Sequence, residues 1–264
     1  MNFPLTRAFL IVAISAALQL HAVEIIGHRG ASHDAPENTL ASFNLGWKQG
    51  ADVDELDIYL TKDKQVVVMH DKNTKRTTGV DGAIASRTLE ELRALDAGSW
   101  KGAQWKGEKI PTLAEAIATI PDGKRMFIEI KCGAEVLPEL ERVLAASGKK
   151  PAQLAIIGFS YETMVAARKK FPQFPVLWIV GTGKKAGDHP PLDTLIEKAK
   201  AAGLNGLDLD YKLPIDAAFA AKAKAAGLQL YVWTVDDAAA AKRLSAAGVD
   251  GITTNRPGWM REQL

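Results

Sequence analysis

The chain has 264 residues, a length that fits one large barrel or two ordinary domains. Hydrophobic residues make up 47% of it and charged residues 24%, which is typical of a globular protein. The formal net charge of +2 argues against a protein that binds nucleic acid through a concentrated basic surface.

The first 22 residues differ in composition from the rest. Arg7 is their only charged side chain, and the apolar run AFLIVAISAALQL follows it and ends at His21-Ala22. This pattern predicts a signal peptide over 1–22, cleaved after Ala22, and therefore an exported protein, periplasmic or secreted. An uncleaved anchor is the alternative, although the run is short of the ~20 residues that a membrane span needs.

Cys132, the only cysteine, excludes an internal disulfide and is interpreted as a packed side chain rather than a nucleophile.

Ionisable residues stand at or near the ends of apolar runs between residues 24 and 71. Parallel α/β folds build catalytic mouths from such strand ends. Only five residues separate the second run from the run 66–69, so the two runs form an antiparallel hairpin and not a parallel crossover. The second arm of this hairpin runs back toward Glu55 and Asp57 and so brings His70 to the barrel mouth. The residues brought together in this way are His28 and Arg29, Glu55 and Asp57, and His70.

Pro36 to Gly50 predicts a helix between the first two strands. Pro36 stands at its start, Glu37 falls in the first turn, and Gly50 closes it.

Glu55 and Asp57 are two residues apart on a strand, so their side chains share one face. Two carboxylates on the inner face of a barrel require a cation to neutralise them. Oxygen ligands favour Mg²⁺, Ca²⁺ or Mn²⁺ over zinc or copper. The alternative is an exposed strand that carries solvated acids.

Residues 71–111 form a long segment rich in Thr, Gly, Ser and Trp. Thr88 predicts the start of a short helix over 89–95, and the length of the segment indicates an insertion between barrel elements. Trp100 and Trp105 either wall a substrate pocket or form a satellite core of the insertion, and we favour the satellite core.

From Thr112 onward, helical patterns and short apolar runs alternate, which predicts a parallel sheet with right-handed crossovers. Gly203, Gly227 and Gly248 each predict a helix end in the left-handed conformation. Without the hairpin arm there are eight strands, the number that closes a (β/α)₈ TIM barrel with a small insertion after the second strand. A doubly wound open sheet is the alternative, but no Gly-rich dinucleotide turn follows the first strand. The strands end near His28, Asp57, Lys131, Ser160, Val180, Asp210, Thr234 and Thr254.

A closed barrel gathers its strand ends at one mouth. The third strand contributes Glu129 and Lys131, the sixth Asp208 and Asp210, and the seventh Trp233. Carboxylates with a cation, beside an arginine and a lysine, predict a site for an anion such as phosphate. Two histidines supply the base and the acid that the cleavage of a phosphodiester needs. No Walker loop supports a nucleoside triphosphate as the ligand.

These motifs resemble the glycerophosphodiester phosphodiesterases from about Ile25 to Pro257. The resemblance implies a barrel enzyme that hydrolyses deacylated phospholipids to sn-glycerol 3-phosphate and an alcohol, with Mg²⁺ or Ca²⁺. The matching segments are His28-Arg29-Gly30, Pro36-Glu37-Asn38-Thr39, Glu55-Leu56-Asp57, His70-Asp71, Arg76-Thr77-Thr78, Ile128-Glu129-Ile130-Lys131 and Trp233-Thr234-Val235.

By position, the resemblance implies a role for nine residues. The metal ligands are Glu55, Asp57 and Glu129; the acid–base pair is His28 and His70; the substrate-binding residues are Arg29, Lys131 and Trp233; and Glu37 orients Arg29. Asn38 either caps the helix or touches the site, and His33 is expected at the surface. Either water attacks phosphorus directly, or the neighbouring glycerol hydroxyl attacks first and forms a cyclic phosphate.

Asp236 and Asn255 depart from the family pattern, and we expect both to lie outside the metal and acid–base set.

Two other functions are open. One is a phospholipase D-like enzyme on lysophospholipids, with Trp100, Trp105 and Trp259 as an apolar rim. The other is a non-catalytic binder of phosphodiesters in the envelope, which would have lost the histidines and carboxylates that this chain retains.

Overall fold

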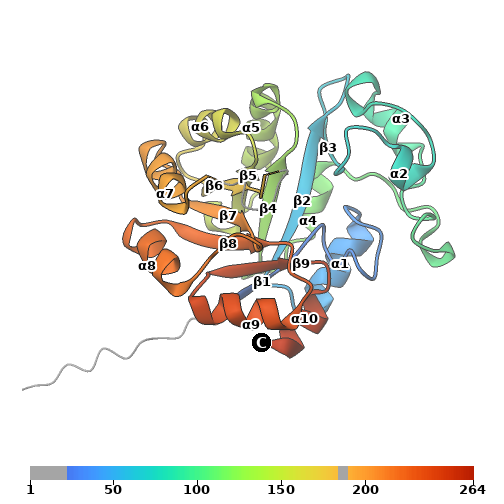
Figure 1. The fold of residues 1–264 in the computed structure, drawn as a ribbon. Coiled ribbons are helices and arrows are strands. Elements are labelled where there is room, and N and C mark those ends of the chain that lie inside the picture. Colours follow the sequence, from blue (N-terminus) through green and yellow to red (C-terminus); the bar gives the residue numbers. More distant parts are fainter. Residues whose placement is uncertain (1–22, 184–189) are drawn as a thin grey trace, which may run out of the picture.

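The computed structural model describes residues 23–183 and 190–264, which include nine strands in one sheet (Figure 1). Eight strands are parallel, and the sheet closes because the first strand pairs with both the second and the last. The predicted (β/α)₈ barrel is confirmed and the open sheet is excluded. The strands are β1 (Glu24–Gly27), β2 (Val53–Leu60), β3 (Val66–Val68), β4 (Arg125–Ile130), β5 (Leu154–Gly158), β6 (Val176–Val180), β7 (Gly206–Asp210), β8 (Gln229–Trp233) and β9 (Gly251–Thr254).

Helices follow the strands and cover the outside of the barrel (Figure 1). Gly203, Gly227 and Gly248 follow three of them with φ of 65°, 76° and 91°, so the predicted left-handed ends are confirmed. The α-helices are α1 (Leu40–Lys48), α2 (Lys75–Thr78), α3 (Leu89–Arg93), α4 (Leu113–Ala118), α5 (Leu137–Ala146), α6 (Tyr161–Lys170), α7 (Leu192–Ala201), α8 (Ala217–Ala225), α9 (Ala238–Ala247) and α10 (Pro257–Gln263). Four 3₁₀ turns accompany them: Ile84–Ser86, Ala103–Trp105, Ala134–Val136 and Pro151–Gln153.

The predicted helix over 36–50 begins four residues later than expected, at Leu40. Asn38 has a φ of 59°, which no α-helix accommodates, and the Thr39 hydroxyl accepts the backbone N–H of Ser42 at 3.2 Å as the true N-cap. The cap therefore prevails over the proline as the start signal. Pro36 and Glu37 lie in the preceding turn, where Glu37 is free to reach the mouth of the barrel.

The β2–β3 hairpin is antiparallel as predicted, with Ile58 opposite Val68. The segment after it, which includes α2 and α3, lies beside the barrel (Figure 1). Aliphatic side chains hold it through a separate cluster that includes Met69, Ile84 and Ile110. The tryptophans are not part of this cluster, and Trp100 is 41% exposed, so the favoured interpretation of Trp100 and Trp105 was wrong.

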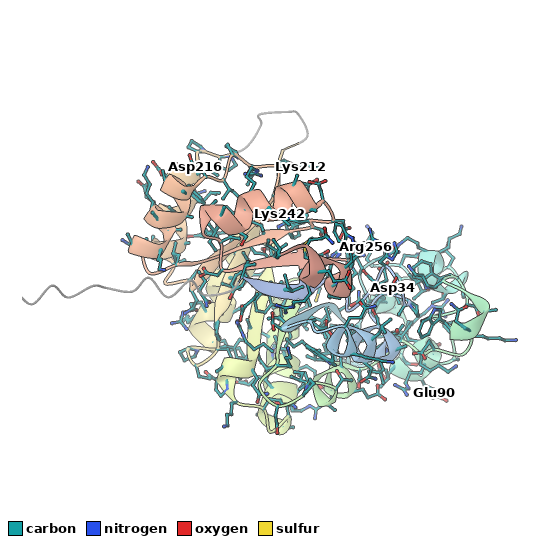
Figure 2. All side chains as sticks on the ribbon, turned by 90° about the horizontal axis from the view of Figure 1, so that it is seen from below. Asp34, Glu90, Lys212, Asp216, Lys242 and Arg256 are labelled. Atoms are coloured by element: carbon teal, nitrogen blue, oxygen red, sulfur yellow. The ribbon has the colours of Figure 1, made fainter. Side chains whose placement is uncertain are left out.

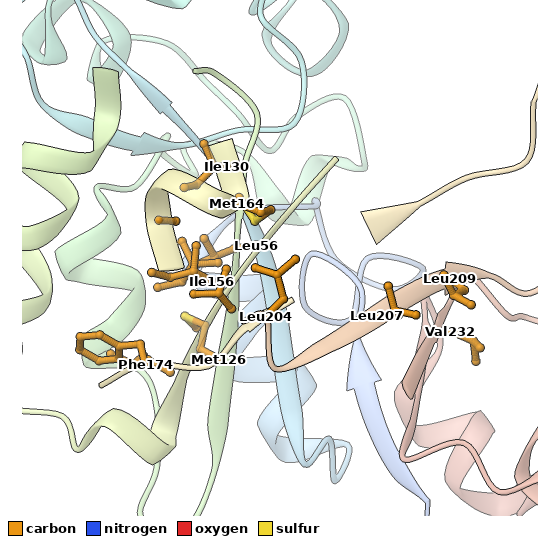
Figure 3. Close-up of a cluster of buried hydrophobic side chains, with 14 of the residues drawn as sticks. Leu56, Met126, Ile130, Ile156, Met164, Phe174, Leu204, Leu207, Leu209 and Val232 are labelled. Atoms are coloured by element: carbon orange, nitrogen blue, oxygen red, sulfur yellow. The ribbon is translucent and has the colours of Figure 1, made fainter. Parts of the chain in front are cut away.

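Strand residues alternate between two apolar layers. The outer layer packs the barrel against its helices and includes Ile130 and Ile156 of the strands and Met164 of α6 (Figure 3). The inner layer fills one end of the barrel with eight buried side chains, including Phe127 and Tyr231, whose rings meet edge to face at 5.0 Å. The inner positions toward the other end of the strands are therefore left for polar residues.

Charged side chains project from the helices and loops around the molecule, among them Glu90, Lys212 and Lys242 (Figure 2). Within residues 23–183 and 190–264, no helix combines the length and the apolar character that crossing a bilayer requires.

Candidate active site

Seven of the nine predicted site residues line a cavity of about 180 Å³ at the carboxyl ends of the strands, and the other two, Asp57 and Glu37, contact Arg29 at its wall. Along β2 the inner face runs from apolar Val53 to Glu55 and Asp57. Along β4 it runs from Phe127 to Glu129. The same period of two that fills the base of the barrel therefore brings ionisable groups to its mouth. Residues that line the cavity are His28, Arg29, Glu55, His70, Glu129, Lys131, Ile157, Phe159, Ile179, Asp208, Trp233, Thr234 and Thr253.

Glu55, Asp57 and Glu129 form a buried acidic triad whose ligand oxygens all lie within 4.8 Å of one another. Glu55 Oε1 and Asp57 Oδ1 are buried without a hydrogen-bond donor. Burial, with the charges of the other two carboxylates, raises the pKa of Glu55 well above its ordinary value, and burial and Asp57 raise that of Glu129. Buried hard oxygens without hydrogen-bond donors, beside two carboxyl groups with raised pKa values, fit a divalent cation, which would favour the ionised form of Glu55 and Glu129.

Two basic side chains lie against the triad. Lys131 Nζ is 2.8 Å from Glu129 Oε1 and 3.4 Å from Asp57 Oδ1. Arg29 Nε is 3.4 Å from Asp57 Oδ2. Burial opposes both charges, but Asp57 and its neighbours raise the pKa of each. Both cations therefore stay charged at the cavity wall, where an anion can reach them.

The backbone at Arg29 is held in the left-handed conformation, with a φ of 57°. Its N–H donates to Glu55 Oε2 at 3.0 Å. Gly30 follows with a φ of 79°, and a Cβ on it would lie 2.5 Å from the backbone of Ser42. This turn thus requires glycine for its conformation and for its packing, and it ties the end of β1 to the triad. Asn38 lies on the same side, because its Nδ2 donates to Asp57 Oδ2 at 2.8 Å.

A chain of ion pairs runs from Arg29 to His70. Arg29 Nη1 donates to Glu37 Oε1 at 2.8 Å, and Arg76 of α2 binds both oxygens of Glu37 at 2.7 and 2.8 Å. Arg76 Nε reaches Asp71 at 2.6 Å, and Asp71 accepts from His70 Nδ1 at 2.7 Å. Burial would raise the pKa of Glu37, but Arg76 and Arg29 lower it to about 2, and Arg76 lowers that of Asp71 to about 2. Arg76 therefore joins the insertion to the barrel mouth.

His28 is fixed from the opposite end of the chain. Its Nδ1 lies 2.7 Å from Asn255 Oδ1, which also accepts from Ser32 Oγ at 2.9 Å. Asp236 accepts both the backbone N–H and the side-chain amide of Asn255. Asp236 and Asn255 are therefore not members of the metal or acid–base set, but Asn255 holds one of its histidines and Asp236 holds Asn255. Burial and the charge of Arg29 lower the pKa of His28 to about 4, so the ring is neutral near pH 7 and Nε2 can accept a proton.

The apolar wall of the cavity comes from the other half of the barrel. Trp233 lies there as expected, edge to face with Phe159 at 5.4 Å. Asp208 lines the cavity as expected for a strand-end residue, without a predicted role, and Phe159, which is 46% exposed, lines it without having been predicted. Their position directly after, or within, buried strands was the available signal.

His33 is exposed as expected and pairs with Asp34 at 2.7 Å. Cys132 packs against the outer layer, and burial raises its pKa to about 11, which suits a structural thiol.

Residues 28–259, which carry every side chain of the cavity, match the model of the glycerophosphoryl diester phosphodiesterase family. The chain belongs to that family. It is therefore a phosphoric diester hydrolase, and the resemblance seen in the sequence is confirmed.

Relatives share both the sequence and the barrel. A glycerophosphodiester phosphodiesterase of Caldanaerobacter subterraneus is 35% identical over 88% of this chain and 94% of its own. A human lysophospholipase D is 29% identical over 90% of this chain and 85% of its own. The structure of an Oleispira antarctica phosphodiesterase in complex with the product sn-glycerol-3-phosphate has a TM-score of 0.81 and 31% identity, covering 91% of this chain and 96% of that one.

Arg76→Ala should lower kcat of the phosphodiesterase about 10- to 100-fold, because Glu37 and Asp71 lose the cation that holds them against Arg29 and His70. Steady-state kinetics and thermal melting measure the two effects separately. The side chain of Arg76 is 43% exposed, so the fold should survive. Arg76→Lys should recover part of the rate, because lysine keeps the positive charge but lacks the paired N–H donors of the guanidinium.

Arg87→Ala, in the same insertion, is the matched control, because among the described residues the Arg87 side chain donates only to the backbone oxygen of Asp81. Equal rates for Arg76→Ala and Arg87→Ala would contradict a positioning role for Arg76.

The double variant Asp236→Asn/Asn255→Asp should move the acidic limb of the kcat/KM profile to higher pH by about one unit. A carboxylate in place of the amide favours the protonated ring, so the pKa of His28 rises and the neutral form is lost at higher pH. The single variant Asp236→Asn keeps the amide at His28 and should leave the limb in place. An unmoved limb in the double variant would mean that His28 does not control it.

Proposed function

We propose that the protein hydrolyses glycerophosphodiesters to sn-glycerol 3-phosphate and an alcohol, using a divalent cation and a histidine acid–base pair. The observation that carries the proposal is the meeting of the acidic triad, two basic side chains and two anchored histidines at one cavity, which every one of these residues except Asp57 lines. The Oleispira phosphodiesterase, whose structure contains sn-glycerol-3-phosphate, supports this choice of product.

Glu55, Asp57 and Glu129 would hold the cation, Mg²⁺ or Ca²⁺. When bound, such a cation neutralises charge on a phosphoryl oxygen. Arg29 and Lys131 would bind the remaining phosphate oxygens from the adjacent wall.

His28 would be the general base, because its ring is neutral and its Nδ1 is held by Asn255. His70 would be the general acid that protonates the departing alkoxide. The ionised carboxylate of Asp71 keeps the Nδ1 hydrogen of His70 in place and leaves Nε2 for the substrate. Trp233 would pack against the glycerol carbons.

Hydrolysis of lysophospholipids is the second candidate. The human relative named a lysophospholipase D and the exposed ring of Phe159 at the cavity favour it. The tryptophans expected to form an apolar rim do not line the cavity among the described residues.

We further propose that residues 1–22 are a signal peptide and that 23–264 form the exported enzyme, with 71–111 as its insertion. Residues 1–22 lie outside the described part of the chain, so the proposal is supported by the sequence pattern alone.

The mature protein should release glycerol 3-phosphate from glycerophosphocholine and glycerophosphoethanolamine with Mg²⁺ or Ca²⁺, and EDTA should abolish the release. His28→Ala should lower kcat/KM by about 10²- to 10⁴-fold through loss of the base. An enzyme-coupled assay for glycerol 3-phosphate gives the rates. His33→Ala, which removes an exposed histidine nearby, should retain full activity.

Release that survives EDTA would overturn the metal assignment, and release unchanged in His28→Ala would overturn the base. Faster turnover of lysophosphatidylcholine than of glycerophosphocholine would replace the main function with the second candidate.

Expression of the full chain with its first 22 residues should give an exported protein that begins at Val23. Intact-mass analysis of the extracytoplasmic fraction measures the new terminus. A protein that keeps Met1 and sediments with membranes would instead support the uncleaved anchor.

A further inference from the structure

Asp208 lies at the middle of β7 with its side chain inside the barrel. Its register partners are Ile179 on β6 and Tyr231 on β8, both members of the inner layer. Its chain neighbours Leu207 and Leu209 pack in the outer layer (Figure 3). Alternation along the strand thus directs the carboxyl group into the cavity, which it lines.

This carboxyl group has no hydrogen-bond partner among the described residues. Asp208 is 3% exposed, Oδ1 has no hydrogen-bond donor, and burial raises its pKa to about 7. The indole N–H of Trp233 on β8 donates to the backbone oxygen of Asp208 at 3.2 Å and not to its carboxyl group. A buried carboxyl without a donor destabilises the folded protein, so its retention in a cavity indicates a ligand that supplies donors.

Asp210, two residues along the same strand, shows the contrast. It is also buried, but Thr182 Oγ1 and the backbone N–H of Lys212 each donate to it at 3.0 Å. It does not line the cavity. The strand therefore satisfies one aspartate internally and leaves the other facing the cavity.

Asp208 is not a fourth member of the acidic triad. The triad stands on β2 and β4, and β5 and β6 separate β4 from β7 on one side of the barrel. Three strands, β8, β9 and β1, separate β7 from β2 on the other side. A carboxylate repels phosphate, so Asp208 faces the part of a substrate that carries no phosphate.

We propose that Asp208 determines specificity for the glycerol moiety by accepting hydrogen bonds from its free hydroxyl groups. This inference rests on the proposed function. The triad, Arg29 and Lys131 bind the phosphate at one wall, and Asp208 binds the glycerol hydroxyls at the other. Phe159 and Trp233 beside it cover the carbons. A phosphodiester without glycerol leaves the carboxyl group buried and unpartnered, and is disfavoured for that reason.

Binding tests the inference directly. Calorimetry of the metal-loaded protein should show that Asp208→Leu weakens sn-glycerol 3-phosphate by about 10- to 100-fold and leaves inorganic phosphate unchanged. Asp208→Asn keeps one acceptor and should lose less. Asp210→Asn is the matched control and should keep the wild-type ratio of the two affinities.

Four substrates separate glycerol from a cationic alcohol as the group recognised. Glycerophosphocholine carries both, glycerophosphoinositol only glycerol, p-nitrophenyl phosphocholine only the cation, and bis(p-nitrophenyl) phosphate neither. Asp208→Leu should lower kcat/KM on the first two alone. A loss on both choline substrates alone would assign Asp208 to the ammonium group and overturn the inference.

The thermal unfolding midpoint tests the role of Asp208 without a measurement of enzymatic activity. Without ligand, Asp208→Leu should melt at a higher temperature than the wild type, because an unpartnered carboxyl is removed, and sn-glycerol 3-phosphate should stabilise the variant less. Equal weakening of glycerol 3-phosphate and phosphate would indicate a merely structural residue. Absence of hydrolysis of all substrates by the wild type would overturn the proposed function, while the affinity ratio would still decide the role of Asp208.

Discussion

Three carboxylates held within 4.8 Å of one another inside a barrel are the constraint on which the site depends. Two charges about 4 Å apart repel by about 4 kcal/mol at an effective dielectric constant of 20, so the group cannot stay ionised alone. The β2–β4 register fixes this contact by placing Asp57 opposite Glu129. Lys131 and Arg29 supply the nearby positive charge, and a divalent cation would supply the rest.

The same constraint explains why an insertion with its own core follows the second strand. Arg29 can bind phosphate only if its guanidinium points into the cavity, and Glu37, in the turn before α1, holds it in that orientation. Arg76 then binds Glu37 to Asp71 and so to His70. The cluster of Met69, Ile84 and Ile110 stabilises the segment that carries Arg76. Packing outside the barrel therefore sets the position of groups inside it.

Sequence periodicity and spacing predicted the barrel and the hairpin, because both depend on local alternation and on turn length, and the family resemblance supplied the nine residues given roles, because it rests on short motifs. They could not pair His28 with Asn255, which is 227 positions away, or show that Asp236 orients that amide. The start of α1 was wrong because Pro36 and Thr39 are competing start signals, and only the left-handed Asn38 decides between them. Phe159 lacked a motif, so only the closed barrel brings it to the cavity, whereas the strand end placed Asp208 at the mouth without indicating its role.

Two buried aspartates without partners show how the same cost has different consequences. Burial raises the pKa of Asp54 on β2 well above its ordinary value, as it does that of Asp208. The Asp54 side chain points out of the barrel interior and packs against Gly27 and Gly46. A Cβ on either glycine would collide with its carboxyl group. Asp54 is fully buried there, so it is best accommodated as the neutral acid. Burial of the Asp208 carboxyl group is equally unfavourable, but this group lines the cavity, where a substrate hydroxyl can donate a hydrogen bond to it. For that reason its burial contributes to recognition.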